Sequence, residues 1–425
     1  MLRDMGVQAQ RAAQLMGGAA RERKDAILLK LADLLESDMQ AVLEANQLDV
    51  ADGIRRGLSP AMLDRLTLNP ARMTGMASDL RGVVLLTDPV GEIFDQMTLP
   101  NGLRVHKQRV PMGVLGVIYE ARPNVTIDVA GLAIKTGNAV ILRGGSETLR
   151  SNQTLVALVH QALADCRMPV EAVQFIPDAD RARVLELLQL HEYVDLIIPR
   201  GGAQLHQYCR ENSRIPVITG GIGICHLYID ASADLEAALP VIYNAKVQRP
   251  TVCNALDTIL VHESIAGKFL PRVVEDLSRA GVTFRADAQA ASILAESRQS
   301  GMRPLEGVYL AGPDDFDIEW LSLVLGIKVV SGLDDAIAHI AAHSTGHSDG
   351  ILTEDSVNAE RFVAEVDSAT VYVNASTRFT DGAQLGLGAE VAISTQRLHV
   401  RGPMGLRELT TYKWVIHGDY HVRSQ

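Results

Sequence analysis

The strongest candidate for a reactive side chain is a cysteine near the middle of the chain. Cys253 lies in the segment NAKVQRPTVCNALDTILV, before a strand-like run, where a side chain can be exposed. Lys246 and Arg249 are close in sequence, and nearby cations lower the pKa of a thiol from about 8.5 toward neutrality. A nucleophile and a small structural residue are both open interpretations of this position. The other cysteines lie inside helix-like or strand-like patterns that favour burial: Cys166, Cys209 and Cys225.

Three histidines have the spacing of one helix face. His339, His343 and His347 follow one another at intervals of four residues, which could present imidazoles to a metal ion. Gly346 is expected to end the helix before His347, and no carboxylate completes a ligand set. The sequence also has no CxxC pair for a zinc knuckle or a redox centre. We therefore predict no metal, and expect the histidines to pack and hydrogen-bond within the fold.

Composition limits the class of protein and its partners. The 425 residues are 47% hydrophobic, with 40 basic and 51 acidic side chains and a net charge of −11. At about 150 residues per domain, this length predicts two or three domains. The charge excludes a uniformly basic nucleic-acid surface, so an anionic substrate would need a local cationic pocket. Four cysteines in a chain of this length, and the absence of a signal-peptide pattern or a membrane-spanning apolar run, predict a cytoplasmic protein without a membrane partner.

The elements that position these residues begin with helices and a hairpin. Within the first 80 residues, an apolar stripe at helical spacing is formed by Ile27, Leu31, Leu34 and Leu35. Asn101-Gly102, between MTLP and LRVHKQRV, predicts a hairpin with a two-residue turn, because Asn-Gly supplies positive φ angles. The hairpin is either an oligomerisation arm or an ordinary surface hairpin.

From Val114 onward, strand-like and helix-like stretches alternate. The strand-like runs VLGVIY, AVILR, VQFI, VDLII and PVIT are separated by helical patterns such as 152–166 and 181–190. A second block repeats this order with IKVV, ILTE and TVYVN, and the chain ends on the strand-like TTYKWVI, which could return beside the hairpin. Such alternation predicts parallel sheets with crossover helices. A dinucleotide domain is the natural interpretation, although the G-x-G-x-x-G fingerprint is absent.

Several segments resemble the aldehyde dehydrogenase superfamily. The stretch around Cys253 resembles its nucleophile turn, and three further blocks resemble the branch that reduces the acyl phosphate of glutamate. These blocks are YEARPNVTIDVAGLAIKTGNAVILRGGSE (119–147), AIAHIAAHSTGHSDGI (336–351) and NASTRFTDGAQLGLGAEVAISTQRLHVRGPMGL (374–406). The similarity covers nearly the whole chain in the family's order.

The resemblance implies an α/β fold of three parts with parallel-rich sheets and a β-hairpin arm. It assigns residues 1–95 and 110–230 to an NADP-binding domain, 231–395 to a catalytic domain, and 96–109 with 396–425 to an oligomerisation arm. A homo-oligomer, either a dimer or a tetramer, is expected. In this superfamily the dinucleotide binds without the glycine fingerprint, in agreement with its absence here.

The implied reaction is the reduction of L-glutamyl 5-phosphate by NADPH to L-glutamate 5-semialdehyde and phosphate, the second step from glutamate to proline. The Cys253 thiolate would form a thioester that accepts a hydride. The Cys253 N–H and the Asn124 side chain would stabilise the oxyanions, unless Asn124 is only a turn residue. The water-activating glutamate of ordinary aldehyde dehydrogenases falls on Ile218 in PVITGGIG, which favours a reductase over an aldehyde oxidiser.

The resemblance also implies cofactor contacts. The family's ribose-binding block reads Arg143-Gly144-Gly145-Ser146 here. Arg143 could bind a 2′-phosphate and Ser146 removes a repelling carboxylate, which favours NADPH. Gly201 and Gly202 would begin a helix facing the pyrophosphate. Glu319 matches the glutamate that holds the nicotinamide ribose, although a solvated helix carboxylate remains the alternative.

The substrate carries a carboxylate, an ammonium and a phosphate, so its pocket needs cations and hydroxyls. The candidates are Arg122, Ser376, Thr377, Arg378 and Arg397; for each arginine a surface salt bridge is the alternative. Functional coupling to glutamate 5-kinase is possible, since the acyl phosphate is labile. The rival interpretations are a coenzyme A-dependent acylating dehydrogenase, a cysteine hydrolase and a non-catalytic binding protein.

Overall fold

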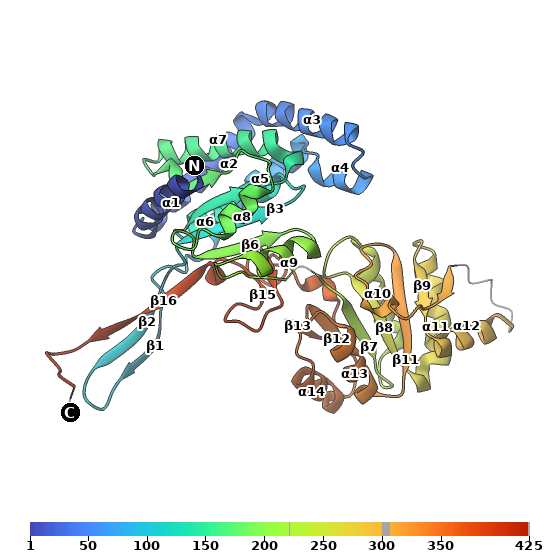
Figure 1. Cartoon of the computed structure of the whole chain (residues 1–425). Helices are drawn as coiled ribbons and strands as arrows, with labels where there is room; N and C mark the ends of the chain where they lie inside the picture. The colour runs from blue at the N-terminus through green and yellow to red at the C-terminus, as the bar shows by residue number, and fades with distance from the viewer. Residues whose placement is uncertain (221, 300–306, 424–425) are drawn as a thin grey trace. The chain divides into compact units, whose positions relative to one another are not determined.

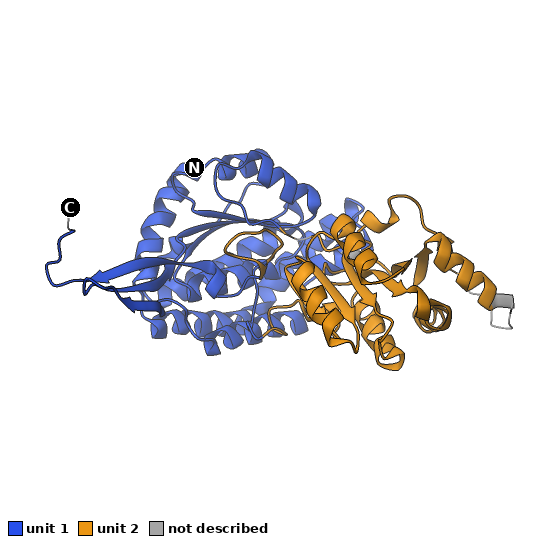
Figure 2. Cartoon of the chain, turned by 90° about the horizontal axis from the view of Figure 1, so that it is seen from below, with its two compact units in different colours: residues 1–219, 386–392, 403–425 blue, residues 220–385, 393–402 orange. Residues whose placement is uncertain are grey.

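The computed structural model describes residues 1–220, 222–299 and 307–423, which form two compact units. Unit 1 comprises residues 1–219, 386–392 and 403–425, and unit 2 comprises residues 220–385 and 393–402 (Figure 2). The chain thus crosses from one unit to the other four times. This division differs from the expected domains, because 220–230 contains a strand of the second sheet and 396–402 also belongs to unit 2.

The first part of unit 1 is helical, as predicted (Figure 1). Its helices are α1 (Leu2–Gly17), α2 (Arg21–Ser37), α3 (Met39–Arg55), α4 (Pro60–Leu66) and α5 (Pro70–Leu85). The predicted apolar stripe lies on α2, and all of its members are buried. Burial of one face against neighbouring helices, rather than intrinsic helix propensity, supplies most of the stability of such helices.

A parallel sheet follows in unit 1, with the strand order β5-β4-β3-β6. Its strands are β3 (Val114–Tyr119), β4 (Ala139–Arg143), β5 (Val173–Phe175) and β6 (Leu196–Arg200). The connecting helices are α6 (Asn124–Lys135), α7 (Leu149–Asp165), α8 (Ala182–Leu188) and, after β6, α9 (Ala203–Asn212). Short 3-10 turns occupy Ser146–Thr148 (η1) and Val170–Ala172 (η2). The run PVIT does not form a strand; its Val217 makes only an isolated bridge to Ile197.

The predicted hairpin consists of β1 (Ile93–Thr98) and β2 (Arg104–Pro111), which are antiparallel. Its turn is longer than predicted, because the Leu99 N–H donates to the Leu103 carbonyl and leaves three residues in the loop. Within that loop Gly102 has a φ of 91°, so only the glycine of the Asn-Gly pair adopts the left-handed conformation. The strand β16 (Thr410–His417) pairs antiparallel with β2, as the sequence indicated.

Unit 2 is built on a larger parallel sheet with the order β10-β9-β11-β8-β7-β12-β13. Its strands are β7 (Cys225–Ile229), β8 (Leu256–His262), β9 (Thr283–Ala286), β10 (Val308–Leu310), β11 (Val324–Val330), β12 (Ser348–Leu352) and β13 (Thr370–Val373). Its helices are α10 (Leu235–Val247), α11 (Glu263–Ser278), α12 (Ala288–Gln299), α13 (Leu333–His343) and α14 (Ser356–Glu365), with 3-10 turns at Asp315–Asp317 (η3) and Thr377–Phe379 (η4). Near the C-terminus, β14 (Ile393–Ser394) and β15 (Gly402–Pro403) form a short ladder, and η5 spans Arg407–Leu409.

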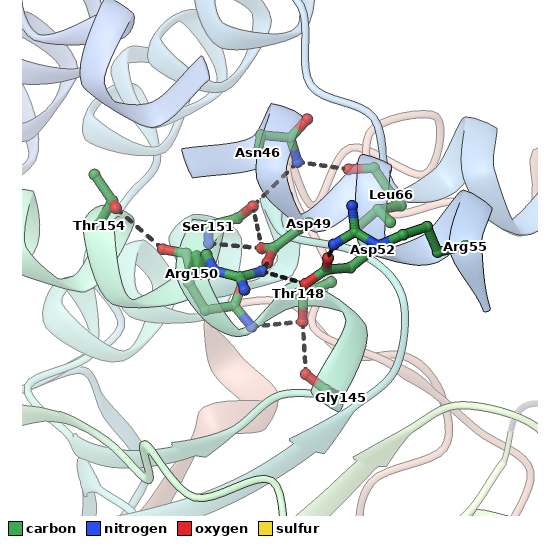
Figure 3. Close-up of polar contacts among 11 residues, drawn as sticks. Asn46, Asp49, Asp52, Arg55, Leu66, Gly145, Thr148, Arg150, Ser151 and Thr154 are labelled. Atoms are coloured by element: carbon green, nitrogen blue, oxygen red, sulfur yellow. Dashed lines mark hydrogen bonds and ion pairs between the residues drawn. The ribbon is translucent and has the colours of Figure 1, made fainter. Parts of the chain in front are cut away.

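A buried carboxylate holds the first turn of α7, which follows the cofactor-binding candidates after β4. Asp49 on α3 accepts hydrogen bonds at its Oδ2 from the N–H and the hydroxyl of Ser151, at 2.8 and 2.7 Å (Figure 3). Its Oδ1 accepts from Arg150 at 3.1 Å. Because Asp49 is buried, these bonds are shielded from water. Asp49 therefore serves as a long-range cap that ties α3 to α7.

We expect Asp49→Ala to lower the free energy of unfolding by roughly 2–4 kcal/mol, because it leaves buried donors unpaired. Urea denaturation followed by circular dichroism measures the loss. Asp52→Ala is the matched control, since Asp52 shares Arg150 but is more exposed, and should cost less than about 1 kcal/mol. Equal losses in the two variants would contradict the capping role of Asp49.

Candidate active site

The candidate nucleophile lies in a tight turn of unit 2. Cys253 falls between α10 and β8, at the amino end of β8, and is partly exposed, whereas Cys209 and Cys225 are buried. Gly223 packs directly on this turn: a Cβ added there would lie 1.6 Å from the Cys253 carbonyl oxygen. A side chain at position 223 is therefore excluded. The Cys225 thiol donates to the same carbonyl at 3.3 Å, and burial raises the pKa of Cys225 well above its usual value, which keeps it protonated.

A buried carboxylate lies behind this turn and joins three segments of unit 2. The Asp257 carboxylate accepts from the N–H of Cys225 at 3.3 Å and of Trp320 at 3.1 Å. The Lys246 ammonium lies 3.8 Å from it. Burial raises the pKa of Asp257 and lowers that of Lys246. Because Lys246 is fully buried, it acts on the framework of the turn and not as an exposed cation beside the thiol.

Glu319 does not lie on a helix, contrary to the solvated-helix alternative, but in the segment between η3 and β11. Its Oε1 accepts from the Gly223 N–H at 2.9 Å, so one glycine contacts both Glu319 and the Cys253 turn. Burial raises the pKa of Glu319 to about 7. The carboxylate is thus fixed next to the nucleophile turn, where its second oxygen can accept a further hydrogen bond.

The predicted substrate hydroxyls are used within the protein. Ser376 and Thr377 are buried; the Ser376 hydroxyl accepts from the Arg378 N–H at 3.3 Å, and the Thr377 hydroxyl donates to the Asn254 carbonyl at 2.7 Å. Both therefore shape the segment that contacts the Cys253 turn. Arg397, in contrast, is 79% exposed and pairs with Asp367. It lines a cavity of about 390 Å³ together with residues before β12 and β13.

In unit 1 the candidates lie at the carboxyl ends of neighbouring strands, where open α/β sheets bind ligands. Arg122 and Asn124 follow β3, Arg143 to Ser146 end or follow β4, and Gly201 and Gly202 follow β6. Asn124 is the first residue of α6, and its amide donates to Asp128 at 2.9 Å. Burial raises the pKa of Asp128 to about 6. Asp128 was not predicted from the sequence, although a carboxylate one turn after Asn124 is a visible signal.

The loop after β4 is closely packed. Arg143 is largely buried, and its Nη2 donates to the Ala179 carbonyl at 2.9 Å. Burial, and then Arg181, act to lower the pKa of Arg143 despite nearby carboxylates. A Cβ on Gly144 would lie 2.2 Å from the Asn152 amide, and one on Gly145 would lie 2.1 Å from Glu147. Arg181, an exposed cation that acts electrostatically on Arg143, was not predicted from the sequence.

The amino end of α9 already holds an anionic group. The Gly202 N–H donates to the Glu120 carboxylate at 3.1 Å. A Cβ on Gly201 would lie 2.4 Å from the same carboxylate. A helix amino terminus attracts anions through its free N–H groups and its dipole. Glu120 therefore occupies the place proposed for the pyrophosphate, and being exposed, it is free to move away.

The three histidines have structural surroundings. His339 and His343 lie on α13 with ring centroids 4.3 Å apart, and His339 also contacts His226 and Phe316. As predicted, the helix ends before Gly346, and the His347 ring bonds to the Ser348 hydroxyl at 2.8 Å. Burial lowers the pKa of His339 to about 2 and of His347 to about 4. Within residues 1–220, 222–299 and 307–423, no group of three or more His, Cys, Asp or Glu side chains is arranged to hold a metal ion.

Comparison with known proteins agrees with this fold. A model of the aldehyde dehydrogenase family matches residues 4–302. A γ-glutamyl phosphate reductase of Escherichia coli strain 536 is 55% identical over the full length of both chains. The crystal structure of a γ-glutamyl phosphate reductase from Thermotoga maritima superimposes with a TM-score of 0.95 at 46% identity, covering 99% of each chain. An acetylating aldehyde dehydrogenase from Geobacillus thermoglucosidasius, 18% identical with a TM-score of 0.71 over 100% of this chain and 98% of its own, shares the fold.

The chain therefore belongs to the aldehyde dehydrogenase family, and within it to the γ-glutamyl phosphate reductases. The predicted fold class and family are confirmed, and the family implies a nicotinamide cofactor. Among the described residues, no helix is both long and apolar enough to cross a bilayer.

Proposed function

We propose that this chain reduces L-glutamyl 5-phosphate to L-glutamate 5-semialdehyde and inorganic phosphate, with NADPH as reductant, in the second step of proline synthesis from glutamate. The observation that carries the proposal is full-length identity of 55% to a γ-glutamyl phosphate reductase. A partly exposed cysteine in a turn that admits only glycine opposite it supports the proposal.

Cys253 is the proposed nucleophile. Its thiolate attacks the acyl carbonyl, the carbon–oxygen bond to phosphate breaks, and phosphate leaves with that electron pair. A bound nicotinamide cofactor would supply the hydride that reduces the resulting thioester. The hemithioacetal then collapses, and the sulfur leaves as thiolate while the aldehyde forms. The Cys253 N–H and the Asn124 amide are the proposed donors to the oxyanion in these steps.

Water must not attack the thioester before reduction. Ordinary family members place a water-activating glutamate where this chain has Ile218. The Ile218 side chain is buried and apolar, so it offers no base. The backbone N–H of Ile218 donates to the Ile197 carbonyl at 3.0 Å. The absence of a carboxylate at this position supports a reductase that releases aldehyde.

The residues of unit 1 fit a dinucleotide phosphate. The buried Arg143 Nε has no hydrogen-bond partner among the described residues, and the glycines of its loop bring backbone close to any ligand. We propose that Arg143, with Arg181, binds the 2′-phosphate that distinguishes NADPH, and that Gly144, Gly145 and Ser146 contact the ribose. Gly201 and Gly202 are proposed for the pyrophosphate and Glu319 for the nicotinamide ribose.

Glu120 sets a testable condition on cofactor binding. Because its carboxylate accepts from the Gly202 N–H, a pyrophosphate bound there must displace it. We expect Glu120→Gln to tighten NADPH binding about three- to fivefold, a gain of about 1 kcal/mol in keeping with charge effects at a helix amino end. Fluorescence titration of NADPH measures the dissociation constant. Glu211→Gln, at the other end of α9, is the matched control, and weaker binding by Glu120→Gln would contradict the displacement.

For the substrate, the proposed cationic groups remain Arg122, Arg378 and Arg397. Ser376 and Thr377 shape the segment that contacts the Cys253 turn.

A homo-oligomer, dimeric or tetrameric, is supported by the sheet β1-β2-β16, whose strand β16 exposes Tyr412, Trp414 and Ile416. We also propose functional coupling to glutamate 5-kinase, because the acyl phosphate is labile. A cytoplasmic location is proposed because no disulfide joins the cysteines of the described residues.

The reverse reaction tests the proposal, since it avoids the unstable acyl phosphate. Purified protein is mixed with glutamate semialdehyde, NADP and phosphate, and the absorbance of the reduced nicotinamide is followed. Phosphate-dependent formation of NADPH is the expected result. Formation with coenzyme A but not with phosphate would replace the proposal with an acylating dehydrogenase, and no formation with either would refute the reductase.

A further inference from the structure

One arginine spans the turn that carries the nucleophile. The Nε of Arg378 donates to the Gln248 side-chain oxygen at 3.0 Å, and its Nη1 donates to the Asn254 side-chain oxygen. Gln248 precedes Cys253 at the end of α10, and Asn254 directly follows it. The guanidinium therefore bonds to one residue before Cys253 in the sequence and to one residue after it.

The segment that presents this arginine is itself bound to the turn. The Asn254 amide donates to the carbonyl of Thr380 at 2.9 Å and of Arg378 at 3.4 Å. The Thr377 hydroxyl returns a bond to the Asn254 carbonyl at 2.7 Å. Asn254 and Thr377 are both buried, so solvent competes little for these bonds. Arg378 thus has its position fixed before any ligand binds.

The charge of Arg378 acts on the thiol. The partly buried guanidinium interacts electrostatically with Cys253 and with Cys225, which burial keeps protonated. Burial and the neighbouring Arg249 lower the pKa of Arg378, but a guanidinium remains charged at neutral pH. The carboxylates that act on these groups are Asp381 at Arg378, and Asp257, Asp349 and Glu319 at Cys225. A negative sulfur is disfavoured by those carboxylates and favoured by Arg378.

We propose that Arg378 activates the nucleophile of this enzyme: its guanidinium stabilises the Cys253 thiolate, and its bonds to Gln248 and Asn254 hold that thiolate in place. The inference rests on the proposed function only in taking Cys253 as the nucleophile. The thiol proton passes to solvent. Arg378 is thus a positioning residue for the nucleophile, in addition to its proposed place among the cationic groups for the substrate.

Alkylation of the free enzyme tests the inference without substrate. Iodoacetamide reacts with the thiolate, forming a carbon–sulfur bond and releasing iodide, so the rate against pH reports ionisation of Cys253. Mass spectrometry of the peptide containing residue 253 measures modification at that site alone. In Arg378→Gln, we expect the midpoint to rise by about one pH unit or more, so that the thiolate fraction at neutral pH falls about tenfold. Arg378→Lys keeps the positive charge, so its alkylation midpoint should lie between those of the unaltered enzyme and Arg378→Gln.

The design keeps the outcomes separate. Arg361→Gln, in the same unit and paired with Glu365, is the matched control and should retain the original midpoint. If Arg378→Gln fails to fold, the unaltered enzyme still tests the inference. The midpoint of its alkylation rate against pH must lie below about 8.5, the pKa of an unperturbed thiol. An unchanged midpoint in Arg378→Gln, or a midpoint of the unaltered enzyme at or above that value, overturns the inference. Turnover by Cys253→Ser would instead refute the nucleophile itself.

Discussion

Cys253→Ser should lower kcat by about 10⁴-fold or more, because removal of a covalent nucleophile leaves only binding and oxyanion contacts. A serine hydroxyl is not ionised at neutral pH, so it cannot form the acyl intermediate at a useful rate. The turn should persist, since its bonds to neighbouring segments are made by the backbone and by Asn254. The initial rate of phosphate-dependent NADPH formation measures the effect.

Cys166→Ser is the matched control for this variant. Cys166 is also only partly buried, but it lies at the end of α7 in unit 1, and burial together with Asp165 raises its thiol pKa. Its replacement should leave kcat within about twofold, as is usual for changes away from a site. A Cys253→Ser enzyme that keeps a tenth of the original rate would contradict the covalent mechanism.

The second large effect is expected at Asn124. Loss of one oxyanion donor lowers kcat by about 10²–10³-fold, so Asn124→Ala should lose that much with little change in KM. The amide is oriented by its bond to Asp128. Above the Asp128 pKa of about 6, the ionised carboxylate accepts only, which fixes the amide nitrogen as the donor; steady-state kinetics at pH 7 measures the loss.

Asn212→Ala controls for removal of an amide from a helix of the same unit. The Asn212 amide donates to the Tyr208 carbonyl on α9, and its loss should leave both kcat and KM unchanged. A rise of KM alone in Asn124→Ala would show that the amide binds ground state and transition state equally. That result would remove Asn124 from oxyanion stabilisation and leave it as a binding residue.

Local sequence predicted those features that depend on neighbouring residues. Periodicity or glycine predicts the α2 stripe, the parallel strands around β3 and the end of α13 before Gly346. The exposed turn of Cys253 follows from a strand beginning directly after it. These features were predictable because the residues that determine them are close together in the chain.

Contacts between distant segments could not be predicted in this way. Three such contacts join residues that are far apart in the chain. They are the packing of Gly223 on Cys253, the hydrogen bond from Gly202 to Glu120 and the hydrogen bond from Arg378 to Gln248. The inward turn of Arg143 and the burial of Thr377 depend on packing that no local pattern specifies. For the same reason PVIT, although strand-like, gained only one bridge.

The order of strands along the chain has a consequence for synthesis on the ribosome. Thr410 of β16 pairs with Pro111 of β2, and the amide of Asn138 donates to the carbonyl of Leu409. Unit 1 therefore cannot finish its structure until about 300 further residues have been translated, roughly 15–60 s at bacterial or eukaryotic speeds. During that interval β2 lacks its partner on one side, an open edge that invites mispairing. Unit 2, whose strands all lie between β2 and β16 in the sequence, is fully translated before unit 1 receives β16.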